Sequence, residues 1–284
     1  MKISPKALQQ AYVEACEAEL LAFKPGNVSI HAEGHDMTVE DFRRSAHVSA
    51  PPLCDPALSL GEKIFRAIAA TRQAVGCNTN LGIVLLAAPL IQACLLEDTV
   101  ASLQDRLAFV LGHTTREDAN WVYRAIRLAS PGGLGESAEA DVHSTPAITL
   151  IEAMKIAEGR DRIAWQYTNS YRNVFDLAIP RYPSWLSLWG NEQWAIVGVF
   201  TGLLIAIPDS HIERKFGTQF TRMVADRMTL VEQAMTHSGN PEQLMRILRT
   251  VDAEFKSAGI NPGTTADLTV ACLLAVRLDR LLQG

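Results

Sequence analysis

The stretch Gly76-Cys-Asn-Thr-Asn-Leu-Gly82, followed by Ile83-Val-Leu-Leu-Ala-Ala-Pro-Leu-Ile-Gln-Ala-Cys-Leu-Leu96, decides the fold. A short polar turn leads directly into an almost unbroken apolar segment, which predicts a buried helix. We expect Asn78 or Thr79 to cap this helix, because a short side-chain oxygen accepts from its first N–H groups. Those N–H groups also suit a phosphate or a carboxylate. From this stretch, capping alone and ligand binding both remain open.

The composition is that of a folded, globular protein. Of the 284 residues 48% are hydrophobic and 20% are charged. The formal net charge of −5 argues against a nucleic-acid partner but leaves anionic small ligands open. The longest apolar runs, 81–96 and 195–207, are shorter than a membrane span, and the first residues lack the apolar core of a signal peptide. We therefore expect a cytoplasmic protein that contacts no membrane.

Apolar side chains recur at helical spacing along the whole chain, and no convincing alternating strand occurs. We predict an all-α protein, a multi-helix bundle that forms a single domain over 1–284. The expected helices include 6–23, 38–49, 58–75, 81–96, 100–111, 147–159, 161–178, 192–207 and 218–237. The prolines at 51 and 52 are expected to mark a loop, and the aromatic residues Tyr182, Trp185, Trp189 and Trp194 to pack around a proline-rich bend.

Polar breaks rich in Gly and Asn interrupt the helices at 24–27, 76–82, 131–136 and 261–263. Glycine permits close approach of the backbone to a ligand, and helix starts offer free N–H groups. We therefore predict an active site where polar helix ends and loops converge. A non-catalytic scaffold does not need four such breaks, so an enzyme is the better interpretation.

These breaks resemble the sequence blocks of a known family. The blocks are Lys24-Pro-Gly-Asn with Gly34-His-Asp-Met37, Asn78-Thr-Asn-Leu-Gly82, Gly132-Gly-Leu-Gly-Glu136 and Asn261-Pro-Gly-Thr-Thr-Ala-Asp267. In this order they resemble the triphosphoribosyl-dephospho-CoA synthase family, and the resemblance covers about residues 17 to 278. It departs where the family has His-Lys and this chain has Asn80-Leu81, and where the family has Arg and this chain has Leu134.

The resemblance implies an all-helical transferase. Family members take ATP, release adenine and join the triphosphoribosyl unit to a hydroxyl of 3′-dephospho-CoA through an α linkage. The departures remove cationic positions, which suits a less anionic acceptor. They resemble a divergent branch associated with tetrahydromethanopterin biosynthesis in one-carbon metabolism. The expected acceptor is therefore either a tetrahydromethanopterin precursor or dephospho-CoA.

Breaking a glycosidic C1–N bond passes through an oxocarbenium-like state, which requires nearby negative charge and a base for the attacking hydroxyl. The candidate catalytic residues are Asp36, Glu19 and Asp118. Asp36 lies in a matching block and is the expected base or ring stabiliser. Glu19 falls on the apolar face of the first helix, and Asp118 points inward near a helix start. At such core-facing positions a carboxylate is costly unless it is paired or has a functional role.

Nucleotide and metal ligands are expected at the same helix ends. Lys24 and Lys215 are expected to neutralise phosphates, and Asn78 and Asn80 to hold ribose hydroxyls or the edge of the base. The full nucleotide-binding set is Lys24, Gly26, Asn27, His35, Asn78, Thr79, Asn80, Gly82, Gly133, Gly135, Lys215, Asn261 and Gly263. ATP is expected to arrive as substrate with Mg²⁺, which one or two carboxylates hold. The candidate metal ligands are Glu136, Asp267 and Asp209.

Two alternatives stay open from the sequence. A kinase or nucleotide phosphohydrolase would use the same anionic site, since no residue pattern states which bond of ATP breaks. The apolar face at 195–207 serves either the core or a homodimer interface.

Overall fold

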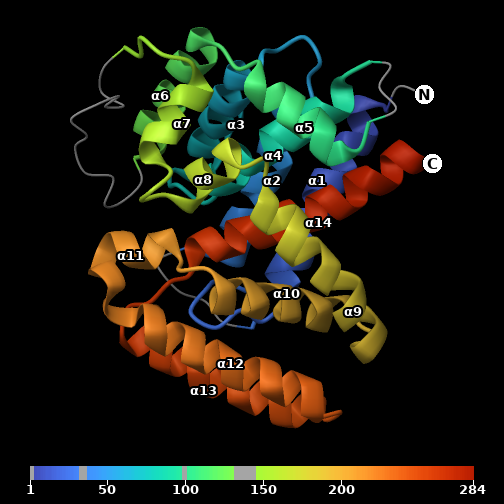
Figure 1. The fold of residues 1–284 in the computed structure, drawn as a ribbon, viewed down its shortest axis with the longest axis vertical. Helices are drawn as coiled ribbons and strands as arrows, with labels where there is room; N and C mark the ends of the chain where they lie inside the picture. Colours follow the sequence, from blue (N-terminus) through green and yellow to red (C-terminus); the bar gives the residue numbers. More distant parts are fainter. Residues whose placement is uncertain (1–2, 32–36, 98–100, 131–144) are drawn as a thin grey trace. The chain divides into compact units, whose positions relative to one another are not determined.

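The chain is almost entirely helical. The computed structural model describes residues 3–31, 37–97, 101–130 and 145–284. In chain order the elements are α1 (Pro5–Leu21), α2 (Val39–Leu53), α3 (Leu60–Val75), α4 (Leu81–Leu95), α5 (Leu103–Gly112), α6 (Arg116–Ala129), α7 (Leu150–Ala157), α8 (Arg162–Thr168), the π-helix η1 (Asn173–Ala178), α9 (Ile179–Trp189), α10 (Glu192–Ala206), α11 (Ser210–Phe216), the 3₁₀-helix η2 (Gly217–Phe220), α12 (Thr221–His237), α13 (Pro241–Ser257) and α14 (Gly263–Gln283) (Figure 1). The described ranges contain no strand beyond single-residue bridges, so the predicted all-α class is confirmed.

The chain divides into two units, each assembled from separate stretches of sequence. Unit 1 comprises Met1–Cys16, Glu40–Arg172 and Leu273–Gly284, and unit 2 comprises Glu17–Val39 and Asn173–Cys272. The chain passes between the units at residues 16–17, 39–40, 172–173 and 272–273, the first time within α1 and the last time within α14. Neither unit is one continuous segment, which agrees with the single-domain class. That the domain has the boundaries 1 and 284 remains a prediction.

Helix α4 forms the centre of unit 1. Residues 83–91 are buried, and α4 packs against α3, α5 and α8. Its apolar side chains surround the whole helix, as expected for a helix with no solvent face. The buried helix predicted over 81–96 is confirmed.

Pro89 leaves a gap in the hydrogen bonds of α4 that two tyrosines fill. Proline has no N–H, so the carbonyl of Leu85 loses its usual partner four residues later. The buried hydroxyl of Tyr167 donates to this carbonyl over 2.6 Å. The hydroxyl of Tyr171 donates to the next carbonyl, that of Leu86, over 3.1 Å. The end of α8 is thereby fixed to the middle of α4.

Replacing Tyr167 by Phe should lower the free energy of unfolding by about 1–3 kcal/mol, because the buried Leu85 carbonyl keeps only the long contact of 3.5 Å with the Tyr171 hydroxyl. In a Pro89→Ala background, the new N–H of residue 89 can serve that carbonyl, so Tyr167→Phe should cost clearly less. Urea unfolding of the four proteins of this double-mutant cycle measures the difference. An equal cost in both backgrounds would contradict the account.

Lys63 of α3 is a buried cation without a carboxylate. Its side chain has no exposed surface, and Nζ donates to Gln92 Oε1 over 2.6 Å. It forms no ion pair with any of the described residues. Burial lowers the pKa of Lys63 to about 8, since the charged form loses its hydration. Between that pKa and the ordinary value of 10.5, the unfolded chain binds more protons than the folded one.

The stability of the protein should therefore rise as the pH increases from about 8 toward 10.5. Lys63→Met should raise the melting temperature at pH 7 and remove this rise, because the uncharged side chain suits its apolar site. Lys6→Met, at an exposed position in the same unit, is the matched control. Thermal unfolding between pH 6 and 10, followed by circular dichroism, tests the expectation. A lower melting temperature for Lys63→Met at pH 7 would argue against it.

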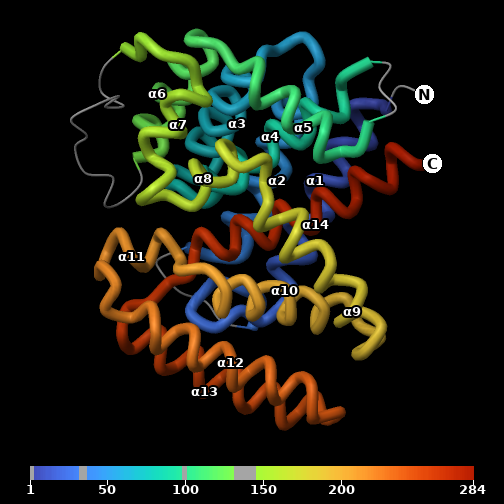
Figure 2. The backbone as a smooth tube through the Cα atoms, viewed as in Figure 1, coloured from blue at the N-terminus to red at the C-terminus, as the bar shows by residue number. Residues whose placement is uncertain are grey.

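Helix α10 holds unit 2 together. It packs against α9 and α12, and α12 lies beside α13 (Figure 2). Its residues 195–204 are all buried, so the apolar face at 195–207 serves the core. Gly198 lets α9 approach closely, because a Cβ at this position would lie 2.4 Å from Cδ1 of the Trp185 indole. An ion pair between Arg181 and Glu232 joins α9 to α12.

Two local predictions near prolines were wrong. The pair Pro51-Pro52 lies inside α2, which continues to the buried Leu53. The fixed φ of proline is compatible with a helix. In the last turn of α2 the two prolines therefore cost only the hydrogen bonds of their two missing N–H groups. The bend expected around Tyr182 and Trp185 is the helix α9, whose Pro180 falls in the first turn, where N–H groups have no partner. Of the four aromatic side chains expected to pack there, Tyr182 and Trp185 are buried, and Trp189 and Trp194 are half-buried.

Two helix boundaries also differ from the prediction. The single helix expected over 161–178 is α8, then a turn with Ser170 and Tyr171 at φ of 47° and 57°, then the π-helix. The connection after 207 contains α11, capped by Asp209. In the described ranges no single helix has both the length and the hydropathy needed to cross a membrane. The pair formed by α10 and Ser210–His237 meets both criteria by length and composition, but it is bent by 48° at the break between the two segments.

Candidate active site

The first and last polar blocks meet in unit 2. The Gly26 N–H donates to Asp252 Oδ1 over 2.8 Å, and Asn27 Nδ2 donates to Asn261 Oδ1 over 2.9 Å. Gly26 adopts a φ of 80°, and a Cβ there would lie 2.9 Å from the carbonyl oxygen of Ile260. Only glycine suits both the left-handed backbone and this close contact. The predicted convergence of polar helix ends therefore holds for these two blocks.

Lys24 lies inside this cluster and not at its surface. Its side chain is fully buried, and Nζ donates to the carbonyls of Glu19, Ala22 and Val28 over 2.8, 3.2 and 3.0 Å. Glu19 Oε1 lies 3.2 Å from the same nitrogen. The carbonyls of Glu19 and Ala22 belong to the end of α1, where a cation also opposes the negative end of the helix dipole. With four oxygens around it, the Lys24 ammonium has no position left for a phosphate in this structure.

Burial shifts both members of this pair away from their ionised forms. It raises the pKa of Glu19 and lowers the pKa of Lys24, and in each case the partner's charge opposes the shift. Glu19, predicted as a catalytic acid, is in this geometry the counter-ion of Lys24.

Asp209 joins α11 to the start of α14. Its Oδ1 accepts from the N–H groups of His211 and Ile212 over 2.8 and 3.1 Å. Its Oδ2 accepts from the N–H and the hydroxyl of Thr265, both over 2.7 Å. Burial raises the pKa of Asp209, while the hydrogen bonds from Thr265 and Ile212 oppose this shift. Both oxygens are fully used, so Asp209 does not fit the role of metal ligand predicted for it.

Cations of α11 lie over the loop before α14. Lys215 is exposed, its Nζ donates to the Gly259 carbonyl over 3.3 Å, and it lies over the Phe216 ring. The His211 ring lies against Gly263, where a Cβ would be 2.7 Å from Nδ1. Arg214 is exposed on the same short helix. Lys215 is thus the predicted phosphate-binding cation that keeps access to solvent.

The second polar cluster lies in unit 1, at the start of α4. Asn78 Oδ1 accepts from the Leu81 N–H over 3.1 Å, so Asn78 supplies the predicted side-chain cap while Asn80 occupies the N-cap position. The hydroxyls of Thr79 and Ser45 lie 2.5 Å apart, and Asn80 Nδ2 donates to Ser49 Oγ over 3.3 Å. The α4 block is therefore bound to α2 by side chains.

Asp118 connects α3 and α6 within unit 1. It forms a capping box with Thr115, and its Oδ1 accepts from the Gly61 N–H over 2.8 Å. Its Oδ2 accepts from the N–H and hydroxyl of Thr115. The inward orientation predicted for Asp118 is confirmed. Its contacts are those of a structural cap, since both carboxylate oxygens accept hydrogen bonds from the protein.

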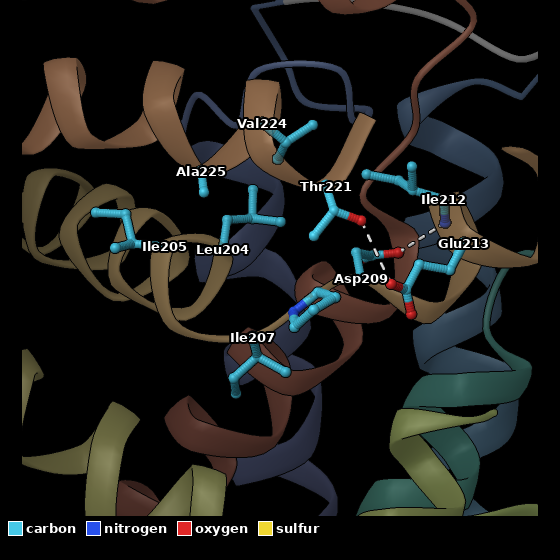
Figure 3. A pocket seen from close by; sticks show the side chains of 10 residues that line it. Leu204, Ile205, Ile207, Asp209, Ile212, Glu213, Thr221, Val224 and Ala225 are labelled. Atoms are coloured by element: carbon cyan, nitrogen blue, oxygen red, sulfur yellow. Dashed lines mark hydrogen bonds between the residues drawn. The ribbon is translucent and has the colours of Figure 1, made fainter. Parts of the chain in front are cut away.

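A small pocket opens in unit 2 between α10, α11 and α12 (Figure 3). Its walls are largely aliphatic, and its polar edge consists of Asp209, Glu213 and Thr221. The Thr221 hydroxyl donates to Glu213 Oε1 over 3.3 Å. Asp209 is the one predicted site residue on its wall, and its oxygens face the protein, so this pocket does not fit the predicted nucleotide site.

Several predicted site residues lie outside the described ranges: Asp36, His35, Gly133, Gly135 and Glu136. Asp267 and Gly82 are half-buried in the first turns of α14 and α4. Within 3–31, 37–97, 101–130 and 145–284, no three His, Cys, Asp or Glu side chains gather as a metal site.

The sequence prediction missed the groups that hold the blocks in place, above all Asp252, Ser45 and Ser49. Asp252 carried a readable signal, because it follows Leu248 by four residues on the apolar face of α13. A carboxylate on such a face needs a partner, as Glu19 did. Ser45 and Ser49 carried no such signal.

Gly26→Ala should destabilise the protein more than Gly76→Ala. Both glycines have φ near +75° to +80°, but no atom lies within 4 Å of a Cβ built at Gly76. The Gly76 variant therefore measures the cost of the left-handed backbone alone, about 1 kcal/mol. Gly26→Ala adds the collision with Ile260 and should lose further stability together with the bond to Asp252. Equal melting temperatures for the two variants would contradict the packing described here.

Comparison with known proteins supports one family. The model of the family described as ATP:dephospho-CoA triphosphoribosyl transferase matches residues 5–284. A crystal structure from Archaeoglobus fulgidus, provisionally described as a triphosphoribosyl-dephospho-CoA synthase, is similar with a TM-score of 0.59 and 23% identity. The match covers 82% of this chain and 96% of the other, and at this identity it supports the fold alone. No curated protein matches the chain.

Proposed function

The chain belongs to the ATP:dephospho-CoA triphosphoribosyl transferase family, and we propose that it transfers the triphosphoribosyl unit of ATP to an acceptor hydroxyl. The observation that carries the proposal is the family match, which extends over 5–284. The four polar blocks add support, because they resemble the blocks of that family and occur in the same order.

In the proposed reaction the acceptor hydroxyl oxygen attacks C1 of the ATP ribose from the face opposite adenine. The C1–O bond forms as the C1–N9 bond breaks, adenine leaves and takes up a proton, and a base takes the hydroxyl proton. Attack from the opposite face inverts C1 and gives an α linkage. A carboxylate near the ring would stabilise the oxocarbenium-like charge.

Asp36 is our candidate for the base. Of the three predicted catalytic acids, Glu19 is paired with Lys24, and Asp118 has both oxygens in hydrogen bonds to α3 and α6. Moving a proton onto either would break contacts that hold the fold. Asp36 lies outside the described residues and keeps the role that its sequence block suggests.

Phosphate binding is proposed for Lys215 together with the N–H groups at the start of α14. The described residues do not supply a metal cage, so no step is assigned to Mg²⁺. A magnesium ion accompanying the nucleotide, with Glu136 and Asp267 as ligands, remains a prediction from the sequence.

The family description supports dephospho-CoA as the acceptor. The departures at Asn80, Leu81 and Leu134 support the second candidate, a tetrahydromethanopterin precursor, because they remove cationic positions that an anionic acceptor would use.

The test is a product analysis with Mg-ATP and each acceptor separately. Adenine that appears only when an acceptor is present supports ribosyl transfer, and the acceptor that works identifies the substrate. ADP, AMP or inorganic phosphate without adenine would instead identify the competing kinase or phosphohydrolase.

Asp36→Asn should lower the rate of adenine release by about 10²–10⁴-fold, the usual contribution of a general base. The melting temperature should stay unchanged. The matched control is Asp55→Asn, which removes an acid elsewhere in the chain, on a turn in unit 1. A rate for Asp36→Asn within a few fold of the wild type, about the scatter of such measurements, would remove Asp36 from the mechanism.

A further inference from the structure

Two aromatic rings hold Arg124 of α6. Its guanidinium carbon lies 4.1 Å from the centroid of the Trp121 ring on α6 and 4.4 Å from the centroid of the Phe65 ring on α3. The two rings are neighbours themselves, with centroids 5.2 Å apart and planes inclined by 43°. A cation is attracted to the π face of such rings. The guanidinium of Arg124 therefore has a fixed place where α3 packs against α6 in unit 1.

Close packing of α3 against α6 keeps the two rings together. A Cβ built at Gly61 would lie 2.6 Å from Cα of Asp118 and 2.9 Å from Cβ of Trp121, so glycine is needed for this approach. The Gly61 N–H donates to Asp118 Oδ1 over 2.8 Å. Phe65 follows Gly61 by one helical turn, and Trp121 follows Asp118 by nearly one. Both rings thus extend from backbone that this contact fixes.

The polar atoms of Arg124 have no partner. It forms no hydrogen bond and no ion pair with any described residue. Arg181, Arg227 and Arg277 are half-buried as well, and each of them pairs with a carboxylate. In the described ranges no nitrogen of Arg124 is among the buried atoms without a partner, so solvent reaches its nitrogens. The guanidinium is thus held in place while its N–H donors stay open.

The acid closest to Phe65 along α3 does not neutralise this cation. Glu62 Oε1 lies 3.4 Å from Nη2 of Arg66, and Glu62 Oε2 accepts from the Ser59 N–H over 3.4 Å. Holding a long side chain in one place costs rotamer entropy, but a guanidinium that is already fixed loses little more when it binds an anion. The chain therefore presents a preorganised cation and supplies no anion for it from the described residues.

The free donors indicate the class of ligand. A guanidinium carries its N–H groups in a planar fork that fits two oxygens of one oxyanion, and a neutral acceptor would leave the charge uncompensated. Phosphate and carboxylate groups both have this geometry. ATP and dephospho-CoA carry phosphate groups, and neither carries a carboxylate.

We propose that Arg124 binds a phosphate group of one of the two substrates through its free N–H donors, while Phe65 and Trp121 position the guanidinium. The inference rests on the proposed function, which supplies these phosphate-bearing substrates. The chemistry is the same whether the phosphate belongs to ATP or to dephospho-CoA. Arg124 thereby adds a phosphate-binding cation in unit 1 to the role proposed for Lys215 in unit 2.

Isothermal titration calorimetry of Arg124→Met with ATP and with dephospho-CoA tests the proposal. Methionine is flexible and apolar, so it can still fill the space beside the two rings, while the charge and the donors are lost. The Kd of one substrate should rise by about 10- to 100-fold, the effect of losing charge-assisted hydrogen bonds. A rise for ATP assigns the site to the donor, and a rise for dephospho-CoA assigns it to the acceptor.

Two variants tie the effect to the held guanidinium. Arg116→Met removes the same charge from an exposed position in the first turn of α6 and is the matched control. It should change neither Kd by more than about threefold, because salt screens exposed charges at that distance. Phe65→Leu keeps the arginine and removes one ring, so it should raise the same Kd as Arg124→Met but by a smaller factor. Thermal unfolding shows whether each variant is folded.

If Arg124→Met does not fold, the wild type supplies the test. Phenylglyoxal modifies arginine side chains that solvent reaches, and mass spectrometry of the digested protein identifies them. At about ten times its Kd, the substrate that Arg124 binds should slow modification of Arg124 by about tenfold and leave that of Arg116 unchanged. Modification of Arg124 at the same rate with and without both substrates would overturn the proposal.

The proposal is also wrong if Arg124→Met leaves both Kd values unchanged, or raises both by the same factor, as a general loss of charge or structure would. Its failure is distinct from that of the proposed function. A protein that releases adenine but whose Kd values do not depend on Arg124 retains the reaction and loses the site. A protein that releases no adenine but binds ATP through Arg124 retains the site and loses the reaction.

Discussion

The buried ammonium of Lys24 is the contact on which the polar cluster of unit 2 depends. It neutralises Glu19 and donates hydrogen bonds to three carbonyls at the end of α1 and in the turn that follows. That turn carries Gly26 and Asn27 to the far end of the chain, where Asp252 and Asn261 bind them. Without the cation, a carboxylate and several backbone oxygens would be buried without partners, which is among the most costly defects in a protein interior.

Two other acids near the predicted site are likewise bound by groups of the protein itself. Asp118 and Asp209 each bind two elements together, and each uses both oxygens to do so. These two acids, which the sequence suggested as a catalytic residue and a metal ligand, therefore hold the backbone in place. This leaves, among the described residues, the exposed Lys215, the start of α14 and the half-buried Arg124 as the groups proposed to bind phosphate, and the base is assigned to the Asp36 block.

The sequence predicted those features that depend on near neighbours. The burial of α4 and the side-chain cap from Asn78 follow from patterns within a few residues. It did not predict contacts between distant residues, such as Tyr167 with Leu85, 82 positions apart, or Gly26 with Asp252, 226 apart. The prolines of α2 and α9 misled for a local reason, since a proline in the first or last turn of a helix does not end it. The position of Glu19 showed in the sequence that this carboxylate needs a partner, but not that the partner is Lys24.

The central claim is that the Lys24 block organises the backbone and leaves nucleotide binding to other groups. A double-mutant cycle of Glu19→Gln and Lys24→Met, followed by urea unfolding, tests it most directly. We predict that Lys24→Met alone lowers the free energy of unfolding by about 3–5 kcal/mol, because it leaves a buried charge unpaired. The double variant should lose less than the sum of the single variants. Unchanged stability in Lys24→Met, accompanied by a loss of ATP affinity, would contradict the claim.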